Sequence, residues 1–286
     1  MKQNIKTELN KIIGLALDED RALNDVTSDL TIPKNHQISF AINSREEIIL
    51  CGVDAIKICF DALKKSKKFA DAKLKLKILA KDGDVVKPLK SIAEGYGDAK
   101  LIFAAERVIL NLLQHLSGVA TITNQFAKLA KNTKILDTRK TIPTLRALEK
   151  YAVATGGGEN HRLNLSDMIL IKDNHIAAAG GIAKAILAAK KSPKKLKIEV
   201  ECDNLQQVAE AVKLRPNIIM LDNMNALQIK QAQKIIDKKC LVEISGGINL
   251  SNIKNFANLG ADFISIGALT HSTRAVDIGL DITTKS

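Results

Sequence analysis

The 286-residue sequence is poor in aromatic residues, with no tryptophan, 2 tyrosines and 7 phenylalanines. Proteins that bind single-stranded nucleic acid stack bases on aromatic side chains set among basic ones. The chain is basic, with a formal net charge of +12, but its lysines are spread along amphipathic segments such as 64–68 and 190–195. The composition therefore argues against nucleic-acid binding and favours a solvated surface around a site for small polyanions.

The sequence also lacks the patterns typical of disulfides, of a zinc site and of a membrane helix. The four cysteines form no CxxC pair and have no histidine at metal-ligand spacing, so we expect buried thiols rather than disulfides or a zinc site: Cys51, Cys59, Cys202 and Cys240. No run approaches the roughly 18 uncharged apolar residues of a membrane helix. Residues 1–10 carry Lys2, Lys6 and Glu8 with no apolar stretch behind them, which predicts a cytoplasmic location.

The first hundred residues predict a mixed α/β domain. Apolar residues from Ile5 to Leu17 share one helical face, and 53–65 predicts a second helix. Residues 37–44 and 73–79 predict strands, the latter because apolar residues alternate with lysines. Residues 101–131 are helical and strongly apolar in pattern, with a break into two helices expected at Ser117-Gly118.

The second half predicts repeated βα units. Short apolar runs occur at 134–136, 168–171, 196–200, 218–221, 241–244 and 263–266. Helical patterns lie between the later runs, at 182–190, 205–214, 226–236 and 250–259. Such units build a parallel sheet with right-handed crossovers that closes towards a barrel. Only six units are visible, so we expect a smaller or open barrel rather than one of eight strands.

Polar residues and glycines follow these runs directly, where the C-terminal ends of barrel strands converge on one ligand-binding face. Their chemistry predicts a pocket for one ligand with carboxylates, a second with phosphates, and a divalent metal. Arginine and lysine suit carboxylates and phosphates, carboxylates suit magnesium, and glycine N–H groups near helix starts cradle phosphate. The residues are Arg139, Lys140, Arg162, Lys172, Glu201, Asp222, Ser245, Gly246, Gly247 and Gly267.

Each of these residues also has a structural interpretation. Glu201 and Asp222 are also typical of charges at helix N-termini, and Gly246-Gly247 of a plain turn. Arg162 could pair with Glu159 at the surface, and His161 could be a satisfied structural histidine. Residues 156–158 are three glycines without the GxGxxG spacing of a dinucleotide site, so we expect a loop that lets His161 and Arg162 reach inward.

The motifs together resemble one family. They are Asp137-Thr-Arg-Lys-Thr-Ile-Pro, Leu145-Arg-Ala-Leu-Glu-Lys-Tyr-Ala-Val, Gly156-Gly-Gly-Glu-Asn-His-Arg and Leu170-Ile-Lys-Asp-Asn-His-Ile, followed by Glu199-Val-Glu, Leu221-Asp-Asn, Glu243-Ile-Ser-Gly-Gly-Ile and Ile266-Gly. Upstream, Glu19-Asp, Asp25-Val-Thr, Ser44-Arg-Glu-Glu, Glu106-Arg-Val and Leu113-Gln-His-Leu-Ser-Gly also fit. The chain resembles the quinolinate phosphoribosyltransferase family of type II phosphoribosyltransferases over nearly its whole length.

The resemblance implies an N-terminal α/β sandwich domain, here 1–112, and an open, incomplete, about six-stranded parallel α/β barrel over 113–272. Residues 273–286 are expected to pack back on the first domain. It also implies a homodimer or higher assembly of dimers, with each site completed by the neighbouring subunit. The implied reaction joins quinolinate to phosphoribosyl pyrophosphate and releases pyrophosphate and CO2, giving nicotinate mononucleotide for NAD biosynthesis.

The resemblance also implies roles for single residues. Quinolinate would be bound by Thr138, Arg139, His161, Arg162 and Lys172, and by Arg107 donated across the dimer. The phosphoribosyl pyrophosphate would be held by Lys140, Ser245, Gly246, Gly247 and Gly267. Lys140, Glu201 and Asp222 would be catalytic, and the two acids would bind Mg²⁺ directly or through water.

Two departures from the family pattern are visible. Ile142 and Thr144 stand where the family has threonine and glycine around Pro143, which should alter packing more than chemistry. Residues 21–24, Arg-Ala-Leu-Asn, replace a more glycine-rich link. Alternatives also stay open: a related type II enzyme acting on nicotinate or another acid, a molybdenum-transport-associated relative, or a basic nucleic-acid-binding protein. Three arginines at positions 107, 139 and 162 favour a substrate with two carboxylates.

Overall fold

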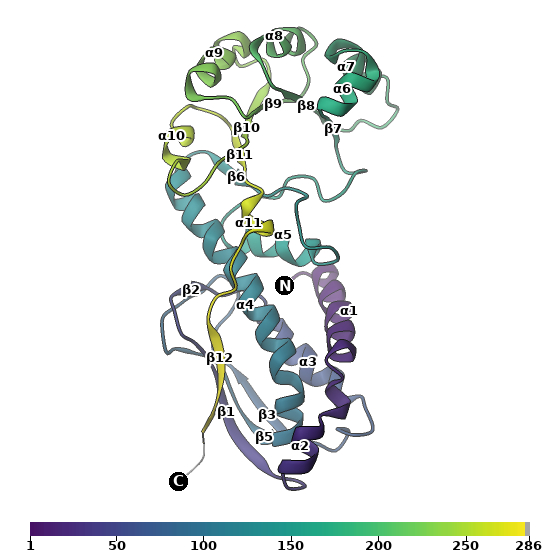
Figure 1. The fold of residues 1–286 in the computed structure, drawn as a ribbon, viewed down its shortest axis with the longest axis vertical. Helices are drawn as coiled ribbons and strands as arrows, with labels where there is room; N and C mark the ends of the chain where they lie inside the picture. The colour runs from purple at the N-terminus through teal and green to yellow at the C-terminus, as the bar shows by residue number, and fades with distance from the viewer. Residues whose placement is uncertain (284–286) are drawn as a thin grey trace. The chain divides into compact units, whose positions relative to one another are not determined.

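The computed structural model describes residues 1–283, and within that range the chain forms two compact units. The first comprises Met1–Ile122, Ile142–Gly157 and the chain from Thr273, and the second comprises Thr123–Thr141 and Gly158–Ser272 (Figure 1). The sequence placed 142–157 with the barrel. In the structure most of this segment forms α5 (Arg146–Thr155) and belongs to the first unit.

The first unit is built on an antiparallel sheet in the order β12-β1-β5-β3. Its strands are β1 (Gln37–Ser44), β3 (Leu74–Ile78), β5 (Ser91–Asp98) and β12 (Ile278–Thr283). Buried and half-buried residues alternate along β1, as a strand packed on one face requires. β12 pairs with β1 over Ser39–Ser44, so the end of the chain completes the sheet that its first hundred residues began. β2 (Ile48–Ile49) and β4 (Val85–Val86) form a separate short pair.

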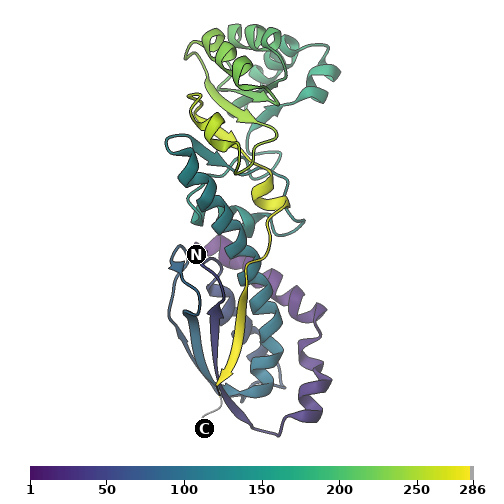
Figure 2. The same cartoon turned by 60° about the vertical axis from the view of Figure 1, so that its left-hand side comes forward.

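Helices of the first unit gather on one side of this sheet, as Figures 1 and 2 both show for α1 and α4. They are α1 (Gln3–Glu19), the 3-10 turn η1 (Ala22–Asn24), α2 (Val26–Thr31), α3 (Asp54–Lys64), α4 (Ala99–Ala130) up to Ile122, and α5. α1 buries Leu9, Ile13 and Leu17, at the helical spacing that the sequence predicts.

The predicted break at Ser117-Gly118 is wrong, because α4 runs without interruption over 32 residues. Both residues serve packing instead. The Ser117 hydroxyl lies 3.0 Å from the Cys51 amide nitrogen, which donates to it. A Cβ at Gly118 would overlap the carbonyl oxygen of Arg274, so glycine permits the C-terminal segment to approach the helix.

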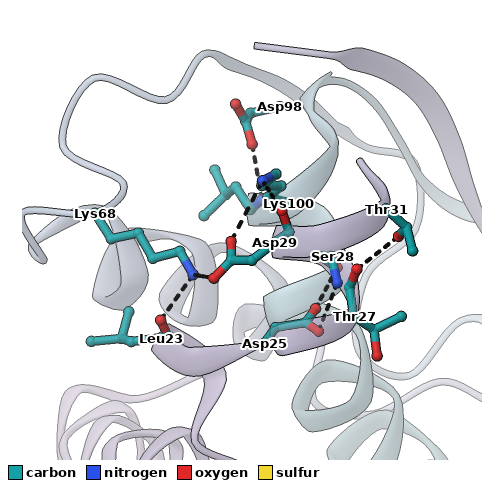
Figure 3. A network of polar contacts seen from close by, with 10 residues as sticks. Leu23, Asp25, Thr27, Ser28, Asp29, Thr31, Lys68, Asp98 and Lys100 are labelled. Carbon is teal, nitrogen blue, oxygen red and sulfur yellow. Dashed lines mark hydrogen bonds and ion pairs between the residues drawn. The ribbon is translucent and has the colours of Figure 1, made fainter. Parts of the chain in front are cut away.

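A polar network fixes the short helix α2 (Figure 3). Asp25 caps this helix by accepting the Ser28 N–H at 3.0 Å, and it also accepts from the Ser28 hydroxyl. The hydroxyl bond first, and then the N–H bond, lower the pKa of the Asp25 carboxyl. Asp29 accepts from Lys68 at 2.9 Å and lies 3.5 Å from the Lys100 ammonium. Lys68 also donates to the Leu23 carbonyl at 2.9 Å, which ties the link at 21–24 to α2.

The second unit contains a parallel sheet of six strands within the described residues, in the order β6-β11-β10-β9-β8-β7. The strands are β6 (Lys134–Leu136), β7 (Ile169–Ile171), β8 (Ile198–Cys202), β9 (Ile218–Asp222), β10 (Leu241–Ser245) and β11 (Phe263–Ser265). β6 and β7 lie at opposite ends of this order, so the barrel is open. Beyond β6, Glu159 forms an isolated parallel bridge with Leu136.

Helices follow the strands on the outside of this sheet, where Figure 1 shows α7, α8 and α9 side by side. They are α6 (Asp173–Ala179), α7 (Ile182–Lys190), α8 (Leu205–Lys213), α9 (Ala226–Ile236), α10 (Ile253–Ala257) and α11 (Ala268–His271). The open α/β barrel predicted from the sequence is confirmed, with strand ends shifted by one or two residues. Within residues 1–283, no helix is both long and apolar enough to cross a membrane.

Candidate active site

A cavity of about 670 Å³ lies at the C-terminal ends of the parallel strands. Every strand of this sheet contributes to its lining, either from its last residues or from the loop that follows it. The lining residues that the sequence singled out are Thr138, Arg139, Lys140, His161, Arg162, Lys172, Glu201, Asp222, Ser245, Gly246, Gly247 and Gly267. Residues separated by more than a hundred positions therefore meet at one place, as the strand-end pattern predicts.

One side of the cavity carries buried positive charge. Arg162 is only 9% exposed, and its guanidinium donates to the Met168 carbonyl at 3.4 Å. Burial and repulsion from Arg139 lower the pKa of Arg162, whereas the charge of Glu199 opposes that shift. Arg162 is buried and Arg139 half-buried. Two guanidinium groups that repel each other favour an anion between or beside them, and carboxylates suit their planar geometry.

The loop that carries His161 and Arg162 is anchored by a buried acid. Asp137 follows β6, is 0% exposed and accepts hydrogen bonds from the His161 amide at 2.9 Å and the Asn160 side chain at 2.6 Å. The Glu159 amide also donates to the Ile135 carbonyl at 2.7 Å. Backbone pairing therefore directs this loop along the edge of β6 and places both side chains at the cavity.

Carboxylates gather on another part of the cavity wall. Glu201 is the last residue but one of β8, Asp203 follows that strand, and Asp222 ends β9. One oxygen from each lies within 4.8 Å of the others. The Lys172 ammonium lies 2.8 Å from a Glu201 oxygen, so the cationic and acidic parts of the wall meet there. Three carboxylates so close together favour a divalent cation or a hydroxyl-rich ligand, because their mutual repulsion is relieved by either.

Glycines after β10 leave the main chain uncovered by side chains. Gly246 and Gly247 have φ angles of 98° and 63°, which side-chain-bearing residues rarely adopt. A Cβ at Gly246 would lie 2.9 Å from the Asn223 amide nitrogen, so no larger residue fits beside the β9 loop. Asn223 itself has a φ of 54° and donates from its amide nitrogen to the Ser245 carbonyl at 2.9 Å. This close packing leaves exposed main chain at the rim, a surface that suits phosphate.

Lys140 is held through its backbone. Its amide donates to the Thr138 hydroxyl at 3.0 Å, and its carbonyl accepts from the Thr270 hydroxyl at 2.7 Å. A Cβ at Gly267 would lie 3.1 Å from the Lys140 side chain. Thr270 therefore links α11 to the loop after β6.

The structure does not bring Arg107 to this cavity. Arg107 lies exposed in α4 of the first unit and is absent from the described residues that line the cavity. The surface pairing of Arg162 with Glu159 is wrong, because Glu159 pairs with Lys134 at 2.9 Å while Arg162 is buried. The roles given to the other lining residues stay predictions.

From the sequence, no site role was assigned to several lining or adjacent residues, although Asn223, Glu199 and Glu243 stand in the motifs quoted above. The full set is Glu199, Asp203, Asn223, Glu243, Ser265 and His271. Glu199 and Glu243 each interrupt an apolar strand and precede by two positions a residue already assigned to the site. Side chains two apart along a strand share a face, so this spacing was the signal that could have found them.

An open parallel α/β barrel with a polar cavity at its strand ends, rich in arginine, carboxylate and exposed backbone, defines an enzyme class acting on carboxylate- and phosphate-bearing substrates. Family models agree with this class. The model for the quinolinate phosphoribosyl transferase N-terminal domain matches residues 25–117, and that for the C-terminal domain matches residues 119–281.

Individual relatives indicate the same family. A probable nicotinate-nucleotide pyrophosphorylase (carboxylating) of Methanocaldococcus jannaschii is 43% identical, over 95% of this chain and 96% of its own. The nicotinate-nucleotide pyrophosphorylase (carboxylating) of Mycobacterium leprae is 38% identical, over 94% and 95%. The crystal structure of nicotinate-nucleotide pyrophosphorylase from Ehrlichia chaffeensis superposes with a TM-score of 0.89 at 43% identity, covering 96% of this chain and 98% of that one. The chain belongs to the quinolinate phosphoribosyltransferase family.

Proposed function

We propose that this protein transfers the phosphoribosyl group of phosphoribosyl pyrophosphate to quinolinate and releases pyrophosphate and CO2, forming nicotinate mononucleotide for NAD biosynthesis. The observation that carries the proposal is the cavity itself, which is lined by buried Arg162, half-buried Arg139, clustered carboxylates and exposed glycine backbone. Family membership supports the same reaction, because the relatives are named for it.

The arginine side of the cavity suits quinolinate. Arg139 and Arg162 offer two guanidinium groups for two adjacent carboxylates, and Lys172 adds a third cation. Fixing both carboxylates aligns the ring nitrogen with the ribose carbon it attacks, so binding energy is converted into orientation. A substrate with one carboxylate, such as nicotinate, would leave part of this charge unbalanced in a buried place.

The acidic side suits magnesium and the ribosyl group. Hard carboxylate oxygens that approach within 4.8 Å of one another match what Mg²⁺ prefers, and Glu201, Asp203 and Asp222 would hold it directly or through water. When bound, Mg²⁺ would neutralise charge on the pyrophosphate. The Lys140 ammonium would bind the same group, and the N–H groups around Gly246 and Gly247 would bind the 5′-phosphate.

The bond changes follow from this placement. The lone pair of the quinolinate nitrogen forms a bond to the ribose carbon while the bond to pyrophosphate breaks, and the departing group takes that electron pair. Glu201 or Asp222 would stabilise the positive charge that develops on the ribosyl carbon. The quaternised nitrogen then stabilises the electron pair left on the ring when the 2-carboxylate departs as CO2, and a proton completes the product.

The proposal is tested by product formation. The purified protein, incubated with quinolinate, phosphoribosyl pyrophosphate and Mg²⁺, should yield nicotinate mononucleotide and pyrophosphate, and omission of Mg²⁺ should abolish both. Parallel incubation with nicotinate distinguishes a related activity on a monocarboxylate. Turnover of nicotinate with no turnover of quinolinate would contradict the proposal.

The proposed active assembly is a homodimer in which Arg107 of a second copy reaches quinolinate. Arg107 is exposed and belongs to the first unit, so its side chain is accessible to a neighbouring copy. Mixing inactive Arg107→Ala chains with inactive Lys140→Ala chains should restore part of the activity, because mixed dimers contain one intact site. No recovery after proven subunit exchange would contradict the shared site.

Two expectations about the protein's surroundings belong to the same proposal. A cytoplasmic location accords with the substrates, which are small charged metabolites. Nucleic acid is not expected as a partner, because the aromatic residues that stack bases are scarce. Salt-sensitive retention on DNA at physiological ionic strength would count against the second expectation.

A further inference from the structure

Two buried acids lie beneath the arginine side of the cavity. Glu199 on β8 and Glu243 on β10 are both 0% exposed, and Glu243 is among the residues that line the cavity. The His161 Nε2 atom lies 3.1 Å from a Glu199 oxygen and 3.7 Å from a Glu243 oxygen. Among the described residues, neither carboxylate receives a well-aligned hydrogen bond. Two buried carboxylates in this state are costly to the fold, which points to a role in the site.

The other ring nitrogen of His161 is also engaged by the protein. The amide of Arg162 donates to His161 Nδ1 at 2.7 Å, so Nδ1 carries the lone pair and not the proton. The proton of a neutral ring must then be on Nε2, facing the two acids. His161 therefore directs its polar atoms to Arg162 and to the acids, and its side chain is only 7% exposed.

Glu199 also balances the positive charge of Arg162. Glu199 raises the pKa of Arg162, opposing the burial and the Arg139 repulsion that lower it. Burial, and then the charge of Glu199, raise the pKa of Glu243, and the charge of Lys172 opposes that rise. His161, Glu199 and Glu243 could geometrically surround a metal ion, but a cation there would add to the positive charge of Arg162 and Lys172 nearby.

We propose that Glu199 and Glu243 are positioning residues for quinolinate binding: they fix the His161 ring, and the ring fixes the backbone that carries Arg162. The inference rests on the proposed function and deepens it, because it names what orients the carboxylate clamp. The acids do not touch the substrate in this account. The His161 ring transmits their effect through the Arg162 amide.

Substitutions at Glu199 and Glu243 test this role. Glu199→Ala should raise the KM for quinolinate about 10-fold or more, as when an outer partner that orients a functional histidine is removed. The KM for phosphoribosyl pyrophosphate should stay within about 2-fold, because the phosphate loops are separate. Glu199→Gln and Glu243→Gln keep a carbonyl oxygen facing Nε2, so each should hold the quinolinate KM within about 3-fold of wild type.

A matched control is available in the first unit. Glu149 is also 0% exposed and lies 2.8 Å from a histidine, His115. Glu149→Gln should lower the melting temperature without raising the quinolinate KM. Equal increases of both KM values in Glu199→Ala, or unchanged values in a folded Glu199→Ala protein, would overturn the proposal.

A second measurement does not depend on catalysis. Nitrogen NMR of the histidine rings, with His161 assigned by its loss in His161→Gln, should show Nε2 protonated and Nδ1 as an acceptor near pH 7. A proton on Nδ1, or a metal ion retained stoichiometrically by wild type and lost in Glu199→Ala, would overturn the inference. If wild type shows no turnover, the proposed function fails, whereas the ring tautomer still tests how the His161 ring is oriented.

Discussion

Two buried histidine–glutamate contacts in this protein differ in how their charges are satisfied. In the first unit, one Glu149 oxygen lies 2.8 Å from His115 Nε2 and the other accepts the Ile142 amide at 3.1 Å. In the second unit, Glu199 and Glu243 share the His161 ring and, among the described residues, receive no well-aligned hydrogen bond. The first contact stabilises the fold, whereas the second keeps a charge arrangement that the site uses, as polar groups at functional sites commonly do.

The largest expected effect removes the positive charge of Arg139, which lies beside Arg162 in the cavity. Arg139→Ala should lower kcat/KM for quinolinate by at least ~100-fold, because a charged group is lost from a preorganised site. Steady-state kinetics with both substrates varied would measure this. Arg215→Ala, an exposed arginine between α8 and β9 outside the cavity, is the control and should leave kcat/KM unchanged. Near-normal turnover of Arg139→Ala would contradict its role.

The His115–Glu149 contact should contribute to the stability of the fold instead. Glu149→Ala leaves His115 and the Ile142 amide without their partner, which should reduce the free energy of unfolding by about 2–3 kcal/mol. Chemical denaturation would measure the change. Glu8→Ala, which removes an exposed acid paired with Lys11, should reduce it by no more than about 0.5 kcal/mol. Equal losses in the two variants would show that the Glu149 contact has no special weight.

The contact of His161 with Glu199 and Glu243 should make the stability of the protein depend on pH. Burial, and then the neighbouring charge of Glu199, raise the pKa of Glu243, while His161, Ser265 and Lys172 oppose the shift. A carboxyl whose pKa is raised in the folded state holds its proton more tightly there. Its contribution is therefore greatest at acid pH and is lost as pH rises from the unfolded towards the folded pKa.

Glu243→Gln removes that titration and keeps the shape of the side chain. The variant should be about as stable as wild type near pH 5 and more stable by about 1–2 kcal/mol near pH 9. Unfolding curves at several pH values would measure the difference. A difference that does not change between pH 5 and 9 would contradict the raised pKa.

The smallest effect concerns a residue that departs from the family pattern. Thr144 has a φ of 71°, where a β-branched residue is strained and glycine is not. Thr144→Gly should therefore raise the free energy of unfolding by about 0.5 kcal/mol, since relief of strain exceeds the entropy cost of glycine. Thermal unfolding would detect this, and a lower melting temperature would contradict it.

Much of the second unit could be predicted from its sequence. Short apolar runs such as Ile218–Asp222 are buried strands, and the parallel topology then forces their polar ends together at the cavity. The acids inside β8 and β10 were missed as site residues, because their burial depends on which strand faces surround His161. Sequence periodicity gives the face of a strand but not the neighbours it meets.

The first unit was harder to predict, because its contacts join distant segments. Gly118 looked like a helix break, but its purpose is the approach of the Arg274 carbonyl from the other end of the chain. Thr144 and Arg21 were noted as departures from the family, and both prove to have positive φ angles, of 71° and 49°. A backbone conformation of this kind cannot be read from a non-glycine residue.

The central claim is that one cavity binds a dicarboxylate and directs its decarboxylation through phosphoribosyl transfer. Quinolinate carrying an isotopic label in the 2-carboxylate tests this directly. The account predicts labelled CO2 and nicotinate mononucleotide in equal amounts, formed only when phosphoribosyl pyrophosphate is present. Labelled CO2 without that substrate, or a nucleotide product that keeps the label, would contradict the claim.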